Sequence, residues 1–160
     1  MTPERRCERY ANIGWVARHL GCRQGGVSCP SEEAIAADQE ALRRGEHLTV
    51  SCSLRGPAPS YPTRLRQGKL ELSQGGIRWR SSWLPGRDPV MIDGPIRSID
   101  VRAAGNEERN VKKGGKMFGV IPLPEFKVVE ATTDGGLVEL AVTSWDVPLV
   151  VSALRGDGRG

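Results

Sequence analysis

The residues best suited to bind a charged group are basic side chains between positions 54 and 87, where seven bases stand against one acid. The net charge of this basic strip is +6, and its members are Arg55, Arg64, Arg66, Lys69, Arg78, Arg80 and Arg87, set against Glu71. Basic side chains at this density attract phosphates, acidic lipid headgroups or an acidic protein surface. They are also typical of the solvated outer face of a sheet, so the pattern leaves both interpretations open.

A glycine-containing loop at residues 110–116 concentrates three more cations, Lys112, Lys113 and Lys116. Its backbone N–H groups and three ammonium groups suit it to hold a phosphate. It is not the phosphate loop of a nucleotide hydrolase, because Met117 stands where that motif needs a Ser or Thr hydroxyl for magnesium. The loop is predicted to be an anion contact or, alternatively, a solvated loop.

The tryptophans divide by their context in the sequence. Trp79 alternates with two arginines and is expected to point inward, and Trp145, just before the last predicted helix, is expected to pack on the sheet. Trp83 precedes a Leu-Pro-Gly turn. It is therefore the tryptophan predicted to be exposed and to contact a partner.

Motifs for catalysis and metal binding are absent from the sequence. His19 and Cys22 stand three residues apart, a spacing that suits two metal ligands, with Cys29 and His47 further on. Zinc sites usually pair their ligands as Cys-x2–4-Cys, and no such pair occurs among the cysteines at 7, 22, 29 and 52. There is no Gly-x-Ser-x-Gly or His-Glu-x-x-His motif. We expect no enzyme activity, no cofactor or metal, and inert thiols.

Length and composition indicate one globular domain that is rich in turns. The chain has 160 residues, 38% of them apolar, with 20 glycines and 11 prolines. No apolar run reaches the ~18 residues of a membrane-spanning helix, and no secretory signal opens the sequence. The protein is expected to be cytoplasmic, free or peripherally attached at the inner face of the membrane.

From His47 onward, apolar and polar residues alternate, which is the pattern of half-buried strands. Strands are predicted at 47–54, 69–73, 77–80, 90–93, 96–101, 117–121, 126–133 and 137–143. Inward positions of the fourth and fifth are Val90, Ile92, Ile99 and Val101. A final helix is predicted to begin at the cap Asp146 and end at Gly156, with an inner stripe of Val147, Val150, Val151 and Leu154. Both Leu140 and Val151 are expected to be buried.

Outside this β domain at 47–155, residues 1–46 are predicted to form a helical, loosely packed N-terminal extension. One helix is expected over 4–20 and a second between Ser31 and Gly45, which has acidic residues in its first turn and basic ones in its last. The extension is either a docking segment or a variable appendage. Residues 156–160 are expected to be a disordered tail.

Seven or so antiparallel strands closed by one C-terminal helix are the plan of a pleckstrin-homology-like (PH-like) β-barrel or roll. The segments CSLR (52–55), GKLEL (68–72), GIRWR (76–80) and LVELAV (137–142) resemble a family of small actinobacterial proteins of unknown function. The family is similar to PH-like domains and usually carries an N-terminal membrane anchor. The resemblance covers about residues 47–155, lacks the anchor helix and carries over no catalytic residues.

The sequence therefore predicts a non-catalytic PH-like interaction module that binds an acidic protein partner or an anionic membrane surface. The expected contacts are Lys112, Lys113, Lys116, Arg64, Arg66, Arg78, Arg80 and Trp83. The alternative is a nucleic-acid-binding protein that uses the basic strip at 54–87, because Arg78 and Arg80 should share an outward face that can follow a phosphate backbone.

Overall fold

The computed structural model describes residues 32–82, 86, 88–92, 94–108 and 126–156. The predicted helix at 4–20, the predicted strand at 117–121, the lysine loop and Trp83 lie outside these residues. Within them, no helix combines the length and the hydropathy that crossing a membrane requires.

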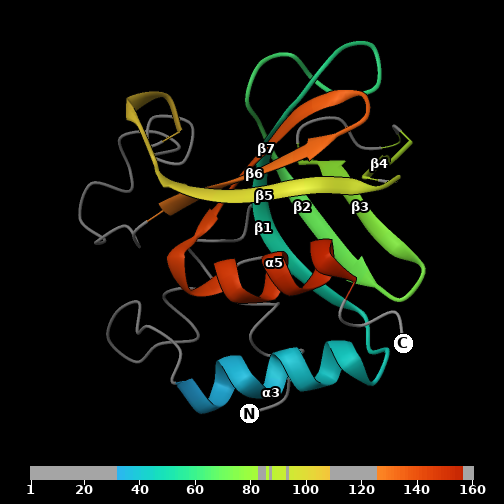
Figure 1. Ribbon diagram of the computed structural model, residues 1–160, viewed down its shortest axis with the longest axis vertical. Coiled ribbons are helices and arrows are strands. Elements are labelled where there is room, and N and C mark those ends of the chain that lie inside the picture. The colour runs from blue at the N-terminus through green and yellow to red at the C-terminus, as the bar shows by residue number, and fades with distance from the viewer. Residues whose placement is uncertain (1–31, 83–85, 87, 93, 109–125, 157–160) are drawn as a thin grey trace.

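Seven antiparallel strands form one curled, half-barrel sheet, which confirms the mainly β prediction (Figure 1). They are β1 (Leu48–Arg55), β2 (Arg66–Ser73), β3 (Gly76–Ser81), β4 (Val90–Ile92), β5 (Ile96–Ala103), β6 (Phe126–Thr133) and β7 (Gly136–Thr143). Their order is β4-β3-β2-β1-β7-β6-β5. The first strand thus pairs with the last, and β4 and β5 are the two edges of the described sheet.

The inner face of the sheet holds the apolar residues that the alternation predicts. In β1 these are buried side chains at every second position, namely Leu48, Val50, Cys52 and Leu54. Buried residues from the other strands and from the C-terminal helix complete the main core, which includes Leu70, Leu72, Ile77, Trp79, Val129 and Leu140. Burial of this apolar surface is the main stabilising contribution to the fold.

A short 3-10 turn, η2 (Ser144–Asp146), leads into helix α5 (Val147–Arg155), which lies over the concave side of the sheet (Figure 1). The buried side chains of α5 are Leu149, Val150, Ala153 and Leu154. The predicted stripe is therefore rotated, because Val147 and Val151 are only half-buried and pack at the margin of the core.

The two ends of α5 lie at the predicted residues, but only the C-terminal end has the predicted cap. Gly156 ends the helix with φ 79°, a left-handed conformation that glycine adopts without strain. Asp146 occupies the N-cap position, but its buried carboxylate accepts a 2.6 Å hydrogen bond from the Thr143 hydroxyl and makes no capping bond.

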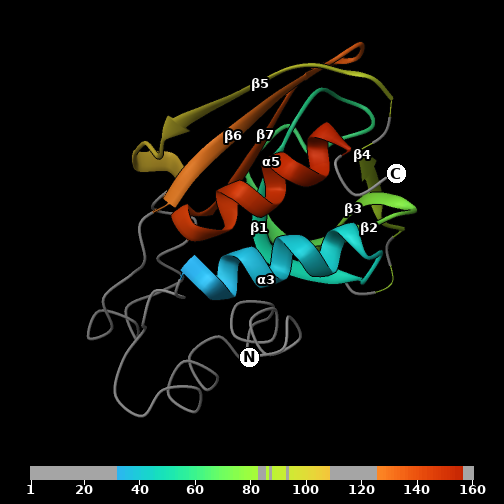
Figure 2. The same cartoon turned by 60° about the horizontal axis from the view of Figure 1, so that its bottom comes forward.

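Helix α3 (Glu32–Arg43) packs beside α5, as both views show (Figure 2). Its first turn carries Glu32 and Glu33 and its last turn Arg43, charges that complement the helix dipole. Ala41 and Leu42 are buried, and Leu42 belongs to the same core as the strands. The described part of the predicted N-terminal extension thus contacts the β domain directly.

One residue that was predicted to face inward, Val101, faces the inner side of the sheet but is not buried. Val101 is 48% exposed, whereas Ile92 is buried, and Val90 and Ile99 are half-buried. Val101 pairs with the buried Val129 of β6 and so lies on the inner side of the sheet. It stays exposed because β5 is an edge strand, which has a neighbour on one side only within the described sheet.

Candidate functional site

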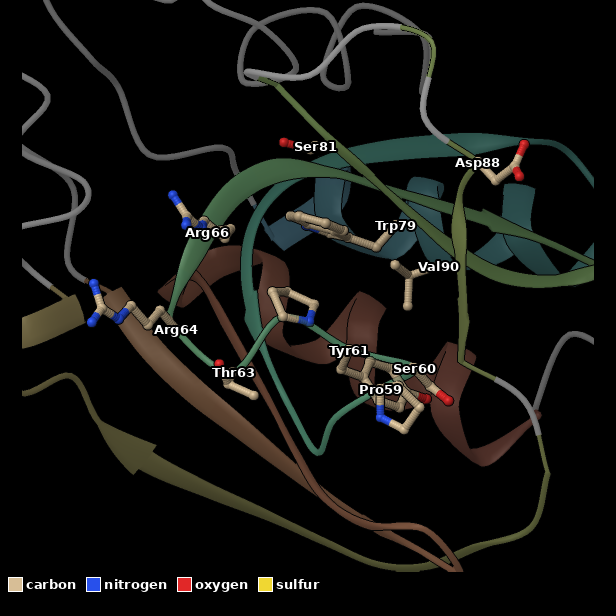
Figure 3. Close-up of a pocket in the computed structure, with 11 residues that line it drawn as sticks. Pro59, Ser60, Tyr61, Thr63, Arg64, Arg66, Trp79, Ser81, Asp88 and Val90 are labelled. Carbon is tan, nitrogen blue, oxygen red and sulfur yellow. The ribbon is translucent and has the colours of Figure 1, made fainter.

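A pocket of about 750 Å³ lies between the β1–β2 connection and the β3–β4 side of the sheet (Figure 3). Its volume is in the range of small-molecule sites. The lining residues are Pro59, Ser60, Tyr61, Pro62, Thr63, Arg64, Arg66, Trp79, Ser81, Asp88 and Val90. The β1–β2 connection lies at the opposite end of the molecule from α3 (Figure 1).

The base of the pocket is set by Trp79, which is only 4% exposed. Its indole Nε1–H donates a 3.0 Å hydrogen bond to the backbone carbonyl of Cys52. The ring packs over Gly68 of β2, where a Cβ would lie 2.5 Å from Cε2 of the indole. A glycine at this position therefore allows the tryptophan to lie flat across β2.

The outer wall of the pocket is a loop that hydrogen bonds hold in place. The backbone N–H of Gly56 donates to Pro62 O at 2.9 Å, and that of Tyr61 donates to Pro57 O at 3.1 Å. The Tyr61 hydroxyl donates a 3.3 Å hydrogen bond to the backbone carbonyl of Met91 in β4. Tyr61 thereby connects the loop to the edge of the sheet across the pocket.

Two predicted binding residues, Arg64 and Arg66, lie together at one end of this pocket (Figure 3). Arg66 is the first residue of β2, and Arg64 precedes it by two positions in the connection. Both are exposed, and within the described residues neither guanidinium forms an ion pair. Guanidinium groups with free N–H donors bind carboxylates and phosphates well, because their geometry matches two oxygens at once.

Three further arginines of the basic strip that the structure describes are engaged with acids. Arg78 and Arg80 both contact Glu71 on β2, at 3.2 Å and 3.0 Å. Arg55 lies 2.6 Å from Glu139. The described arginines of the strip therefore fall into a paired group, Arg55, Arg78 and Arg80, and the two arginines at the pocket.

The remaining predicted contacts are not placed by the structure. Lys112, Lys113, Lys116 and Trp83 lie outside the described residues. Of the four cysteines, Cys52 lies in the described residues, and its thiol is buried. Among the described residues no group of three acidic, His or Cys side chains is arranged to hold a metal ion.

The outer face of the sheet carries an ion cluster that the sequence did not reveal. Glu139 accepts hydrogen bonds from Arg55 at 2.6 Å and from Arg102 at 2.8 Å. Arg102 also donates to Glu108 at 2.8 Å and to Glu130 of β6. These contacts join β1, β5, β6 and β7, and they hold the turn after β5 against the sheet.

These contacts also shift the pKa values of the carboxyl groups. The hydrogen bond from Arg55 is the main reason that the pKa of Glu139 lies below its usual range. Burial acts to raise the pKa of Glu108, but the hydrogen bond from Arg102, with other contributions, outweighs it and the pKa is lowered. Both carboxyl groups are therefore ionised at neutral pH.

Because of these shifts, we expect the free energy of unfolding to fall as the pH drops below about 4.3, the usual pKa of a glutamate in an unfolded chain. A lowered folded-state pKa contributes stability that is present above the unfolded pKa and lost as the pH falls through the folded pKa. Urea unfolding at a series of pH values measures this. In Glu139→Gln the slope against pH should be smaller than in the wild type. Equal slopes in the wild type and Glu139→Gln would contradict the assignment.

Comparison with known proteins found no matching family model, no matching curated protein and no matching solved structure. The functional argument therefore rests on the pocket and its charges.

Proposed function

We propose that this chain is a non-catalytic interaction module on a PH-like barrel, which binds an acidic group of a protein partner or of an anionic membrane surface. The strand order supports the PH-like assignment. A meander whose first strand pairs with its last, and whose interior is covered by a C-terminal helix, is the plan expected of such a barrel.

The observation that carries the proposed binding function is the pairing state of the arginines. Arg64 and Arg66 line a concave site and have no carboxylate partner within the described residues. An anion that enters the pocket would therefore not have to displace an internal ion pair in that region. The pocket also has an apolar base, which lowers the local dielectric and strengthens such an interaction.

The lining residues favour binding over catalysis. Ser60, Thr63 and Ser81 contribute hydroxyl groups, and the described lining contains no histidine or lysine to act as their base; its one carboxylate, that of Asp88, has no histidine to act through. An extended nucleic-acid backbone is supported less well than a single acidic group. Arg78 and Arg80, which would extend the contact, already share Glu71 as a partner.

The proposed location of the protein is the cytoplasm, either free or at the inner face of the membrane.

Replacing both pocket arginines, as Arg64→Gln/Arg66→Gln, is expected to weaken binding to anionic vesicles about 30-fold. Each basic residue near an anionic surface contributes about 1 kcal/mol, and about 1.4 kcal/mol is tenfold in affinity. The measurement is cosedimentation with phosphatidylcholine vesicles with and without phosphatidylglycerol. A glutamate-rich peptide and a single-stranded oligonucleotide, each titrated at several salt concentrations, are the other two probes.

The matched control is Arg78→Gln/Arg80→Gln, which removes the same charge from the paired group. It should lose much less affinity for vesicles or peptide than the pocket variant does. A third variant, with Lys112, Lys113 and Lys116 changed to Ala, measures the contribution of the lysine loop. Binding of the oligonucleotide alone, with steep salt dependence, would favour the nucleic-acid alternative. Equal losses in the two arginine variants would reject the pocket as the site.

A further inference from the structure

The pocket carries charges of opposite sign at its two ends. Arg64 and Arg66 lie at one end and Asp88 at the other, with Trp79 and Val90 between them (Figure 3). Asp88 is exposed, and within the described residues its carboxylate forms no ion pair. Among the described residues, the site therefore presents donors and an acceptor that form no ion pair, on either side of an apolar middle.

A ligand with a single negative charge uses only half of this arrangement. It would gain from the arginines, but the Asp88 carboxylate would repel it, since like charges raise the free energy of the complex. A ligand that carries a cation a few bonds away from its anion would gain at both ends. A short aliphatic linker between the two would lie against the side chains of Trp79 and Val90.

We propose that the pocket recognises a dipolar group, in which a phosphate or carboxylate is joined by a short linker to an ammonium group. The anion binds at Arg64 and Arg66 and the ammonium binds at Asp88. This inference rests on the proposed function, because it requires that the arginine end binds anions. It adds the chemical class of the ligand. It also predicts that the pocket prefers a dipolar ligand to a simple anion, a preference that charge attraction to a basic surface does not produce.

Phosphoethanolamine and ethyl phosphate are the two probes, because they share the phosphate and a two-carbon chain and differ in the ammonium group. Affinities are measured by following the four indole N–H signals in NMR titrations. We expect the wild type to bind phosphoethanolamine about three- to fivefold more tightly, the factor that a partly exposed ion pair of up to about 1 kcal/mol supplies.

Asp88→Asn separates this inference from the proposed function. The variant should lose the preference for phosphoethanolamine, while its affinity for ethyl phosphate should rise because the repulsive carboxylate is gone. Asp100→Asn, which removes an exposed carboxylate outside the pocket lining, should change neither affinity. Arg64→Gln/Arg66→Gln should weaken both probes.

Two outcomes would overturn the inference in distinguishable ways. If both probes bind the wild type equally well and Asp88→Asn changes their two affinities to the same extent, the dipolar ligand is wrong and the anion site is retained. If neither probe binds the wild type, the proposed function fails together with the inference.

Cosedimentation with phosphatidylethanolamine vesicles distinguishes the two possible sources of the ligand. Asp88-dependent sedimentation with them indicates a lipid headgroup, and binding of free phosphoethanolamine alone indicates a small molecule.

Discussion

Leu140→Ala is expected to lower the free energy of unfolding by about 2–5 kcal/mol, which is the range for removing a fully buried leucine side chain. Leu140 has no exposed surface, and it lies in β7 between β1 and β6. It faces Leu54 on one side and Val129 on the other. Because both neighbouring strands fix the backbone here, the cavity left by the truncation cannot close easily. Urea unfolding followed by far-ultraviolet circular dichroism measures the change.

The same strand provides the matched control. Leu137 is 45% exposed near the β6–β7 turn, so Leu137→Ala should change stability by no more than about 0.5 kcal/mol. Equal losses for the two variants would mean that the inner and outer positions of β7 have been assigned incorrectly.

The alternation of apolar residues was sufficient to predict most of the sheet. Leu48, Val50, Cys52 and Leu54 are buried as expected, because in a strand every second side chain faces the same side. The buried side of α5 was predicted less accurately. Its short sequence is apolar almost all round, so the stripe depends on how the helix lies against the sheet and not on its own periodicity.

The outer-face ion cluster could not be predicted, since its partners come from strands that are far apart in the sequence. Arg55 and Glu139 are neighbours only because β1 pairs with β7. A local signal did exist for Arg78, because the hairpin between β2 and β3 places it directly opposite Glu71. That register already indicates that part of the basic strip is neutralised by a cross-strand pair.

The candidate site was predicted in part. Arg64 and Arg66 were among the residues expected to bind an anion, but the pocket that they line was not expected. Its walls depend on how the loop after β1 reaches the edge strand, through the contact between Tyr61 and Met91. Asp88, which gives the pocket its second charge, comes from a different part of the chain. Loop paths of this kind follow from tertiary packing and leave little trace in local sequence patterns.

Gly68→Ala is expected to destabilise the fold by about 1–3 kcal/mol, the usual cost of inserting a methyl group into a filled space. An added Cβ would meet the backbone carbonyl of Arg80 in the neighbouring strand and would lie 2.5 Å from the indole of Trp79. The contact with the carbonyl is the closer one, at 2.2 Å, so the backbone must shift there, and we expect the indole to be displaced as well. Its hydrogen bond to the carbonyl of Cys52 would then lengthen or break. The base of the pocket would change with it.

Two measurements together test this coupling between fold and site. Urea unfolding gives the loss of stability, and the NMR signal of the Trp79 indole N–H, assigned by its loss in Trp79→Phe, reports the hydrogen bond to Cys52. The matched control is Gly75→Ala in the β2–β3 turn, where the nearest atom to a new Cβ is the Ser73 hydroxyl at an ordinary 3.6 Å. The control should leave the indole signal unchanged and cost little stability. If Gly68→Ala also leaves that signal unchanged, the indole of Trp79 does not pack against Gly68 as described. Since Trp79 forms the base of the pocket, a displaced indole should also weaken the binding of ethyl phosphate, although both pocket arginines remain in place.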